Sequence, residues 1–200
     1  MSKLRLMVAT RNRHKSDEIR AMVGDRFEVV DANDIDGLPE IEETGTSFLE
    51  NATLKAVGIS RCVEGLVLSD DSGLEVDALG GKPGVWSSSF GGEEGNHALN
   101  NQRMLREMDG VAADRRSARF RCVMVIARGG ELLADFSGAV EGRIITELRG
   151  EGGFGYDPLF VPDGFNRSFA ELGGEVKNQL SHRARALGQA VEWLERQGRE

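Results

Sequence analysis

Asp70 and Asp71 give the clearest chemical signal in the sequence. They directly follow Leu66-Val67-Leu68-Ser69, a short apolar run that is typical of a buried strand. An acid at the end of a strand can hold Mg²⁺ or accept a proton from water. Because adjacent side chains of a strand point to opposite sides, at most one of the two acids can enter a cleft directly. The alternative is a polar turn, since the following Ser72 and Gly73 are also turn formers.

Further carboxylates and a lysine lie between residues 31 and 62. Glu42 and Glu43 belong to an acidic loop that spans about 31–46. A hard divalent cation takes carboxylates from separate segments, so this loop could contribute to a metal site. Asn51 and Lys55 are four residues apart on the helix expected to follow, and therefore share a face. The alternatives are a solvated acidic loop and a solvent-facing pair.

Polar and cationic side chains follow the first expected strand. Thr10, Asn12 and Lys15 lie where strand 4–9 meets helix 15–23, a position at which open α/β sheets bind ligands. The N-terminus of a helix offers N–H groups and the positive end of the helix dipole, and both suit phosphate. The segment lacks the frame of a Walker A motif. An ordinary capped helix start with surface charges is the alternative.

A glycine-rich loop further along the chain could hold a flat base. Phe154, Gly155, Tyr156 and Asp157 form its centre. Glycine lets the backbone approach a ligand closely. Phe154 or Tyr156 could stack on the base, and Asp157 could hydrogen-bond to its edge. A tight structural turn is the alternative.

A second group of basic residues lies at the start of the last expected helix, 181–197. Lys177 precedes this helix, and His182 and Arg183 open it. They suit an anionic ligand or the edge of a base, although a lone His at a helix start is more often a cap or a surface residue. All these groups together suit a metal-bound nucleotide. A cleft lined with carboxylates would repel a polyphosphate unless a divalent cation bridged the two.

Apolar strand-like runs and helical stripes alternate along the chain, which predicts a layered α/β domain. The expected strands are 4–9, 27–30, 66–69, 74–79, 118–127 and 132–140, and the expected helices are 15–23, 47–62, 96–108 and 181–197. We expect strand 74–79 to continue strand 66–69 beyond a bend, and Ser47 with Glu50 predicts a capping box. No repeat or flexible linker interrupts the chain. We therefore expect a single domain over 1–200, with a central sheet and two lobes flanking a cleft.

The composition of the chain argues against several classes of function. The chain holds 25 Lys and Arg residues against 33 Asp and Glu residues, for a net charge of −8, which disfavours a basic surface for nucleic acid. No run approaches the roughly 18 apolar residues of a membrane span. The N-terminal segment has no signal-peptide cleavage pattern, so we expect a cytoplasmic protein without a membrane partner. Cys62 and Cys122 lie in apolar surroundings, which predicts two buried free thiols.

Seven motifs follow one another along nearly the whole chain. They are Ala9-Thr10-x-Asn12-x-x-Lys15, Glu42-Glu43-Thr44-Gly45, Phe48-x-Glu50-Asn51-Ala52-x-x-Lys55-Ala56, Asp70-Asp71-Ser72-Gly73-Leu74, Gly80-Gly81-x-Pro83-Gly84, Gly152-Gly153-Phe154-Gly155-Tyr156-Asp157-Pro158 and Ser181-His182-Arg183. In these motifs and their order the chain resembles the inosine/xanthosine triphosphate pyrophosphatase family. The resemblance implies an elongated, mixed α/β fold with two lobes around a nucleotide cleft, and a homodimer. It also implies Mg²⁺-dependent hydrolysis of deaminated purine nucleoside triphosphates (ITP, dITP, XTP) to the monophosphate and pyrophosphate.

The same resemblance implies roles for the motif residues. Asp71 is the general base and a metal ligand, and Glu43, alone or with Glu42, assists the metal. Lys55 supports the phosphate charge, and Ser72 contacts the substrate. The polyphosphate is held by Thr10, Asn12 and Lys15, and the purine pocket consists of Phe154, Gly155, Tyr156, Asp157, Lys177, His182 and Arg183.

Two positions depart from the family pattern. Arg11 stands where the family usually has Gly, so the phosphate loop is expected to be less tight. Ser89 stands where the family commonly has an Arg that acts as an anchor. Arg11 or Arg13 could supply the missing cation.

Other functions remain as alternatives. A Maf-like pyrophosphatase for other modified nucleotides shares the broad architecture, but the Ser181-His182-Arg183 motif argues against it. A non-catalytic nucleotide-binding protein is a different class. Asp71 and Lys15 weigh against that class, because a pure binding protein needs no base. A nucleic-acid-binding module is disfavoured by the net charge of −8.

Overall fold

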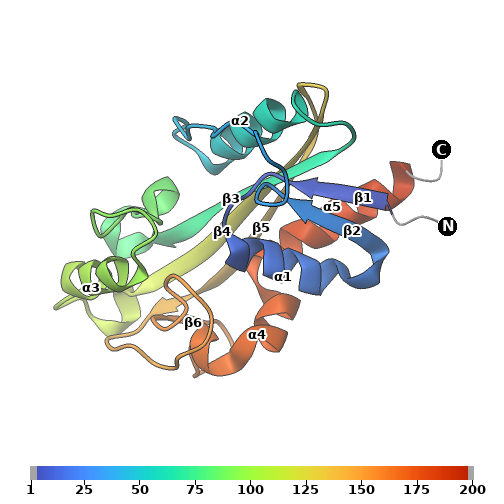
Figure 1. Ribbon diagram of the computed structural model, residues 1–200. Helices are drawn as coiled ribbons and strands as arrows, with labels where there is room; N and C mark the ends of the chain where they lie inside the picture. The colour runs from blue at the N-terminus through green and yellow to red at the C-terminus, as the bar shows by residue number, and fades with distance from the viewer. Residues whose placement is uncertain (1–3, 198–200) are drawn as a thin grey trace. The chain divides into compact units, whose positions relative to one another are not determined.

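The computed structural model describes residues 4–197 and contains a six-stranded mixed sheet with helices packed on it (Figure 1). The strands lie in the order β2-β1-β3-β4-β5-β6. Strand β1 pairs in parallel with β2 and β3, whereas β5 pairs antiparallel with β6. The strands are β1 (Leu4–Val8), β2 (Phe27–Asp31), β3 (Val67–Val76), β4 (Ser117–Arg128), β5 (Glu131–Ile144) and β6 (Phe160–Pro162). The helices are α1 (Arg13–Val23), α2 (Phe48–Ser60), α3 (His97–Glu107), α4 (Phe169–Leu180) and α5 (His182–Gln197).

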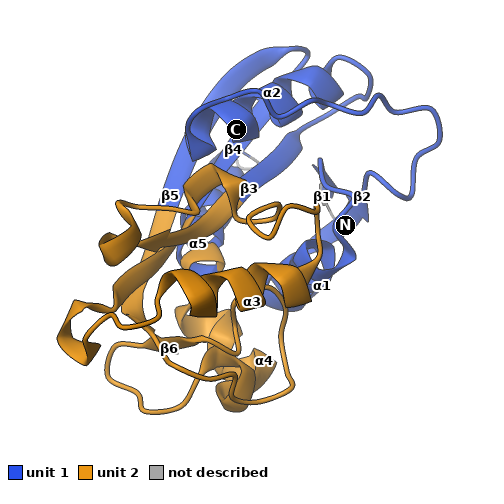
Figure 2. Ribbon diagram, turned by 90° about the vertical axis from the view of Figure 1, so that its left-hand side faces the viewer, with its two compact units in different colours: residues 1–71, 122–137, 184–200 blue, residues 72–121, 138–183 orange. Residues whose placement is uncertain are grey.

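The chain divides into two compact units (Figure 2). Unit 1 comprises residues 1–71, 122–137 and 184–200, and unit 2 comprises residues 72–121 and 138–183. Strands β3, β4 and β5 contribute residues to both units. In the described part of the chain, residues 4–197, no helix has the length and apolar character needed to cross a membrane.

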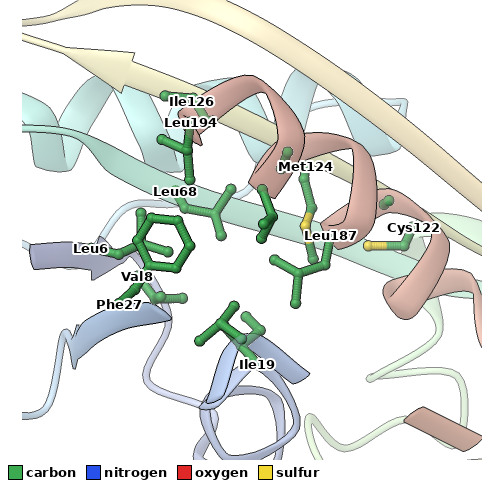
Figure 3. Packing of buried hydrophobic residues seen from close by; sticks show 14 residues of the cluster. Leu6, Val8, Ile19, Phe27, Leu68, Cys122, Met124, Ile126, Leu187 and Leu194 are labelled. Carbon is green, nitrogen blue, oxygen red and sulfur yellow. The ribbon is translucent and has the colours of Figure 1, made fainter. Parts of the chain in front are cut away.

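The core of unit 1 has two sides, because alternate residues of a strand face opposite sides of the sheet. On one side Leu6 and Leu68 pack with Ile19 of α1 and Leu187 of α5 (Figure 3). On the other side Met7, Val67 and Ile59 belong to a separate apolar cluster, to which α2 contributes. Helices α1 and α2 therefore cover opposite faces of strands β1 and β3.

The core of unit 2 is rich in aromatic rings. Phe120 and Phe160 meet edge to face with their centroids 4.7 Å apart, and Phe169 stacks on Phe160 at 5.4 Å. These arrangements are the favoured geometries of aromatic pairs. Tyr156 and Leu74 join the same cluster, so both the glycine loop and the second half of β3 are fixed by this core.

The predicted strands and helices occur in the predicted order, but β6 and α4 were not predicted, and Lys177 lies inside α4. Further differences concern particular residues. Strand β3 runs without a break from Val67 to Val76, so residues 70–73 lie inside a strand and not in a bend. Ser47 caps α2 by accepting a hydrogen bond from the amide of Glu50, and the Glu50 carboxylate accepts hydrogen bonds from the amide and hydroxyl of Thr46. Cys62 is exposed, whereas Cys122 is buried as predicted.

Candidate active site

Asp70 and Asp71 point to opposite sides of β3, as the period of a strand requires. Asp70 forms an ion pair with Lys15 of α1, with 3.0 Å between Oδ2 and Nζ. Asp71 instead contacts α2, where it accepts a hydrogen bond from Asn51 Nδ2 at 3.2 Å. Because the interior of a strand and not a turn holds both carboxylates, their positions are fixed by the sheet.

Lys55 links the acidic loop to Asp71. Its ammonium lies 3.0 Å from Glu43 Oε1 and 3.8 Å from Asp71 Oδ1. Two carboxylates from separate segments therefore converge on one cation of α2. Both glutamates are exposed, but Glu43 is the one that forms an ion pair with Lys55. Of the two glutamates proposed as metal ligands, the geometry favours Glu43.

The pKa values of Asp71 and Lys55 are both shifted, and the shifts suit a role for Asp71 as a base. Burial raises the pKa of Asp71 to about 6, and it outweighs the opposing attraction of Lys55 and Lys15. Burial alone would lower the pKa of Lys55, but Asp71, Asp70 and Glu43 outweigh it and raise that pKa. Lys55 therefore stays protonated, and Asp71 titrates close to neutral pH, where a general base is most effective.

The donor set around Asp71 fits a magnesium ion that is shared with a phosphate ligand. Among residues 4–197, no group of three or more His, Cys, Asp or Glu side chains could hold a metal ion. Mg²⁺ keeps several waters and usually takes only one or two protein carboxylates, with phosphate oxygens completing its shell. Asp71 and Glu43 match that requirement, since both lie within 4.0 Å of the same ammonium.

The start of α1 is a capped helix terminus. Asn12 Oδ1 accepts hydrogen bonds from the amides of His14 and Lys15, at 3.0 and 3.4 Å, and Thr10 Oγ1 accepts one from the amide of Asn12. Arg11 donates to the carbonyl of Leu38 at 2.9 Å. The guanidinium of Arg11 therefore ties this segment to the loop that follows β2, and the cap accounts for Asn12 without a ligand.

Asp157 organises the glycine loop in unit 2. Its Oδ2 accepts hydrogen bonds from the amide of Phe154 at 2.9 Å and from Lys177 Nζ at 2.7 Å. The Lys177 ammonium also lies 4.4 Å from the centroid of the Phe154 ring, and the Arg183 guanidinium lies 5.9 Å from it. A Cβ on Gly153 would overlap Asp157 Oδ2, so the loop requires glycine there. The structure thus brings together four of the residues predicted for a purine pocket.

Tyr156, His182 and Arg183, which were also predicted for the pocket, are buried, whereas Gly155 is half-buried. Tyr156 is 3% exposed, and its hydroxyl donates to the carbonyl of Ser87, so its ring belongs to the core. His182 stacks on Phe120 with the ring centroids 4.9 Å apart. Arg183 donates to Ser72 Oγ at 2.9 Å. Phe154, which is half-buried, is therefore the better placed of the two loop aromatics for stacking on a base.

Residues 6–193, nearly the whole chain, match the Ham1 family. The chain belongs to this family. Its relatives include proteins named dITP/XTP pyrophosphatase. The one from Desulforamulus reducens is 44% identical over 96% of each chain, and the one from Bacillus licheniformis is 46% identical over 91% of this chain and 93% of the relative. The resemblance inferred from the motifs is thereby confirmed.

Solved structures of the Ham1 family share the fold. The Ham1 protein of Staphylococcus aureus superimposes with a TM-score of 0.85 at 33% identity, covering 96% of this chain and 99% of its own. The HAM1 protein of Coxiella burnetii gives 0.86 at 35% identity with the same coverage. The dITP/XTP pyrophosphatase of Mycobacterium abscessus gives 0.75 at 36% identity, covering 94% and 99%. The predicted α/β fold with a mixed sheet is confirmed.

Three contacts involve Asn51 and Asp70, whose roles the sequence analysis left open, and Asn101, which it did not name. Asn51 bonds to Asp71, Asp70 bonds to Lys15, and Asn101 of α3 donates to the carbonyl of Gly155 at 3.0 Å. The spacing of Asn51 and Lys55 was a usable signal, because it places both on one face of α2. Asn101 gave no such signal, since 54 residues separate it from Gly155.

Proposed function

We propose that the chain hydrolyses dITP, XTP and ITP to the nucleoside monophosphate and pyrophosphate, and so removes deaminated purines from the nucleotide pool. Two dITP/XTP pyrophosphatases related over nearly full length support this function. The observation that carries it is the setting of Asp71, a buried carboxylate with a pKa of about 6 between Asn51 and Lys55. Such a group is suited to take a proton from an attacking water.

In this proposal, Asp71 accepts the proton of the water that cleaves the anhydride bond between the α- and β-phosphates, and pyrophosphate leaves. A positioned base typically contributes about 10²–10⁴-fold to the rate. Lys55 keeps its positive charge beside the reacting carboxylate, and Lys15 offers a second ammonium held by Asp70. Thr10 and Asn12 hold the segment that carries Lys15 in place through the cap of α1.

Asp71 and Glu43, with Glu42 as a further acid on the same loop, are the residues that would hold Mg²⁺. The ion, when bound, supplies positive charge that offsets the developing charge on the phosphates. The acid excess around Lys55 makes such a counter-charge necessary, because carboxylates repel a triphosphate.

We assign the purine to the cluster around Phe154. Its ring offers a face for stacking; the Lys177 ammonium lies 4.4 Å from the ring centroid, and the central carbon of the Arg183 guanidinium lies 5.9 Å from it. Hypoxanthine and xanthine carry a carbonyl at position 6, where adenine carries an amino group. A site that donates a hydrogen bond to that carbonyl leaves its buried donors unpaired when adenine binds, and this costs binding free energy.

We also propose that the protein forms a homodimer. Size-exclusion chromatography with light scattering tests this proposal.

A panel of nucleoside triphosphates, assayed with and without Mg²⁺, tests the proposed function. We expect dITP, XTP and ITP to yield pyrophosphate, and not orthophosphate, only when Mg²⁺ is present. ATP should be turned over about 5- to 150-fold more slowly, because each unpaired buried donor costs about 1–3 kcal/mol. Equal rates on ATP and ITP would contradict the assigned selectivity. Binding of ITP without any hydrolysis would favour a non-catalytic nucleotide-binding protein, and turnover confined to other modified nucleotides would favour a Maf-like enzyme.

A further inference from the structure

We propose that Asn51 is a positioning residue that fixes both the orientation of the Asp71 carboxylate and the path of the loop carrying Glu43. The inference rests on the proposed function, since it assigns Asn51 to the same reaction. Asn51 is 3% exposed and lies in the first turns of α2. Its Oδ1 accepts a hydrogen bond from the amide of Gly45 at 2.8 Å, and its Nδ2 donates to Asp71 Oδ2 at 3.2 Å.

The chemistry of the two partners determines which way the Asn51 amide is turned. A backbone N–H can only donate, so the atom of Asn51 that faces Gly45 must be the carbonyl oxygen. The amide nitrogen then faces Asp71, and an ionised carboxylate can only accept. In this one orientation of the amide, both the oxygen and the nitrogen of Asn51 form their hydrogen bonds. Neither Asp nor Leu at position 51 could make the two bonds together.

The two oxygens of Asp71 have different neighbours as a result. Oδ2 faces Asn51, whereas Oδ1 is the oxygen that lies 3.8 Å from Lys55 Nζ. Two contacts at separate oxygens fix the rotation of the carboxylate plane, which one contact would leave open. A neutral amide achieves this without adding a full charge beside the base. The Asp71 oxygens are therefore held for water or metal in one orientation.

The other half of Asn51 acts on the acidic loop. Gly45 approaches Asn51 so closely that a Cβ on Gly45 would lie 2.6 Å from Asn51 Oδ1. Glu43 precedes Gly45 by two residues and reaches Lys55, which lies one turn beyond Asn51 on α2. Asn51 thus connects two carboxylates that come from separate parts of the chain.

Two substitutions at position 51 separate the two bonds. Asn51→Asp keeps an acceptor for the Gly45 amide but replaces the donor to Asp71 with a like charge, whereas Asn51→Ala removes both bonds. Asn166→Asp is the matched control, because it makes the same chemical change at an exposed position. For each protein we would measure kcat and KM for dITP with Mg²⁺, the thermal midpoint, and calorimetric binding of an α,β-methylene analogue of ITP, which is not hydrolysed.

We expect both position-51 variants to fold and to bind the analogue within about threefold of wild type. Their kcat should fall about 10- to 100-fold, in line with the loss of one hydrogen bond to a charged group. Asn166→Asp should match wild type. Retention of full kcat by Asn51→Asp, or failure of both variants to fold, would overturn the inference in favour of no role or a purely structural one. Wild-type protein that releases no pyrophosphate would instead contradict the proposed function itself.

Discussion

Ionising Asp71 is costly for the folded chain, because burial raises the pKa of its carboxyl to about 6 from an ordinary value of 3.8. Each pKa unit corresponds to about 1.4 kcal/mol, so the cost is about 3 kcal/mol. Between those two pH values the folded chain holds a proton that the unfolded chain has released. Stability therefore falls as pH rises through this window, and the loss is complete above pH 6. The chain tolerates this cost at the residue that the proposed reaction needs as a base.

Asp71→Asn should consequently stabilise the protein at neutral pH in the absence of Mg²⁺. The amide has no charge to desolvate, so the thermal midpoint at pH 7 should exceed that of wild type by several degrees. The difference between the two proteins should shrink toward pH 4, where the Asp71 carboxyl is protonated in wild type. Thermal unfolding followed by circular dichroism between pH 4 and 7 measures this difference. A variant that is less stable than wild type at pH 7 would contradict the assigned burial cost.

Arg11 stabilises the fold through hydrogen bonds from its guanidinium to backbone carbonyls. Its guanidinium donates to the carbonyls of Leu38 and Ala32, at 2.9 and 3.5 Å. We expect Arg11→Ala to lower the free energy of unfolding by about 1–2 kcal/mol, since each such bond is worth about 1 kcal/mol. Arg13→Ala is the neighbouring control, because it removes the same guanidinium from an exposed side chain on the same segment. Urea denaturation compares the two. Equal stability would show that the Arg11 contacts contribute nothing.

Gly153 and Gly155 lie in the same loop, but substitutions at these two positions should have different effects. Gly153 and Gly155 both have a positive φ, at +74° and +63°, which costs any other residue about 1–2 kcal/mol. A Cβ at Gly155 meets nothing within 4 Å, whereas a Cβ at Gly153 overlaps Asp157 Oδ2. Only the substitution at Gly153 therefore disturbs the bonds from Asp157 to Phe154 and Lys177.

Gly153→Ala should raise KM for dITP at least about tenfold, and Gly155→Ala should raise it less. Loss of the charged Asp157–Lys177 bond accounts for this difference, because such bonds contribute about 1.5–3 kcal/mol. Steady-state kinetics with thermal midpoints for both variants provide the measurement. A larger effect of Gly155→Ala would argue that the backbone of residue 155, and not the Asp157 cluster, holds the base.

Local patterns were sufficient to predict most elements. The alternation of a strand correctly separates Asp70 from Asp71. The first helix was expected from residue 15 but begins at Arg13, with Asn12 as its N-cap. Helical spacing over 96–108 predicts that Leu99, Met104 and Met108 point inward; both methionines are buried, but Leu99 is 37% exposed. The inner face of α3 includes the polar Asn100 and Asn101, whose amides bond to loop backbone. Hydrophobic periodicity cannot detect a helix face that packs through amides.

Contacts between distant segments could not be predicted from the residues alone. The spacing between Asp157 and Lys177 is 20 residues, and that between Asn51 and Asp71 is also 20. Neither spacing follows a helix or strand period, so only the fold brings these pairs together. Family resemblance pointed to three of these residues, and the structure adds which atoms meet. The sequence analysis did not predict that β3 is continuous, because Gly73 and the two preceding acids are residue types that favour turns.

For the whole molecule, both the net charge and the family membership favour a small anionic ligand over a nucleic acid. The chain has a net charge of −8, and Lys15 and Lys55 in unit 1 and Lys177 in unit 2 each pair with a carboxylate. Acids therefore offset the charge of these lysines, and the chain as a whole stays acidic. This distribution suits a small polyanion brought with a divalent cation better than a nucleic acid. The Ham1 family match over residues 6–193 is consistent with that conclusion.

Pyrophosphate release from dITP by wild type and by Asp71→Asn, at saturating Mg²⁺, tests the central claim most directly. We expect the variant to stay folded and to bind the triphosphate but to turn it over at least about 100-fold more slowly, which is the lower limit expected for loss of a positioned base. Turnover by Asp71→Asn at a rate near that of wild type would contradict the assignment of Asp71 as the base.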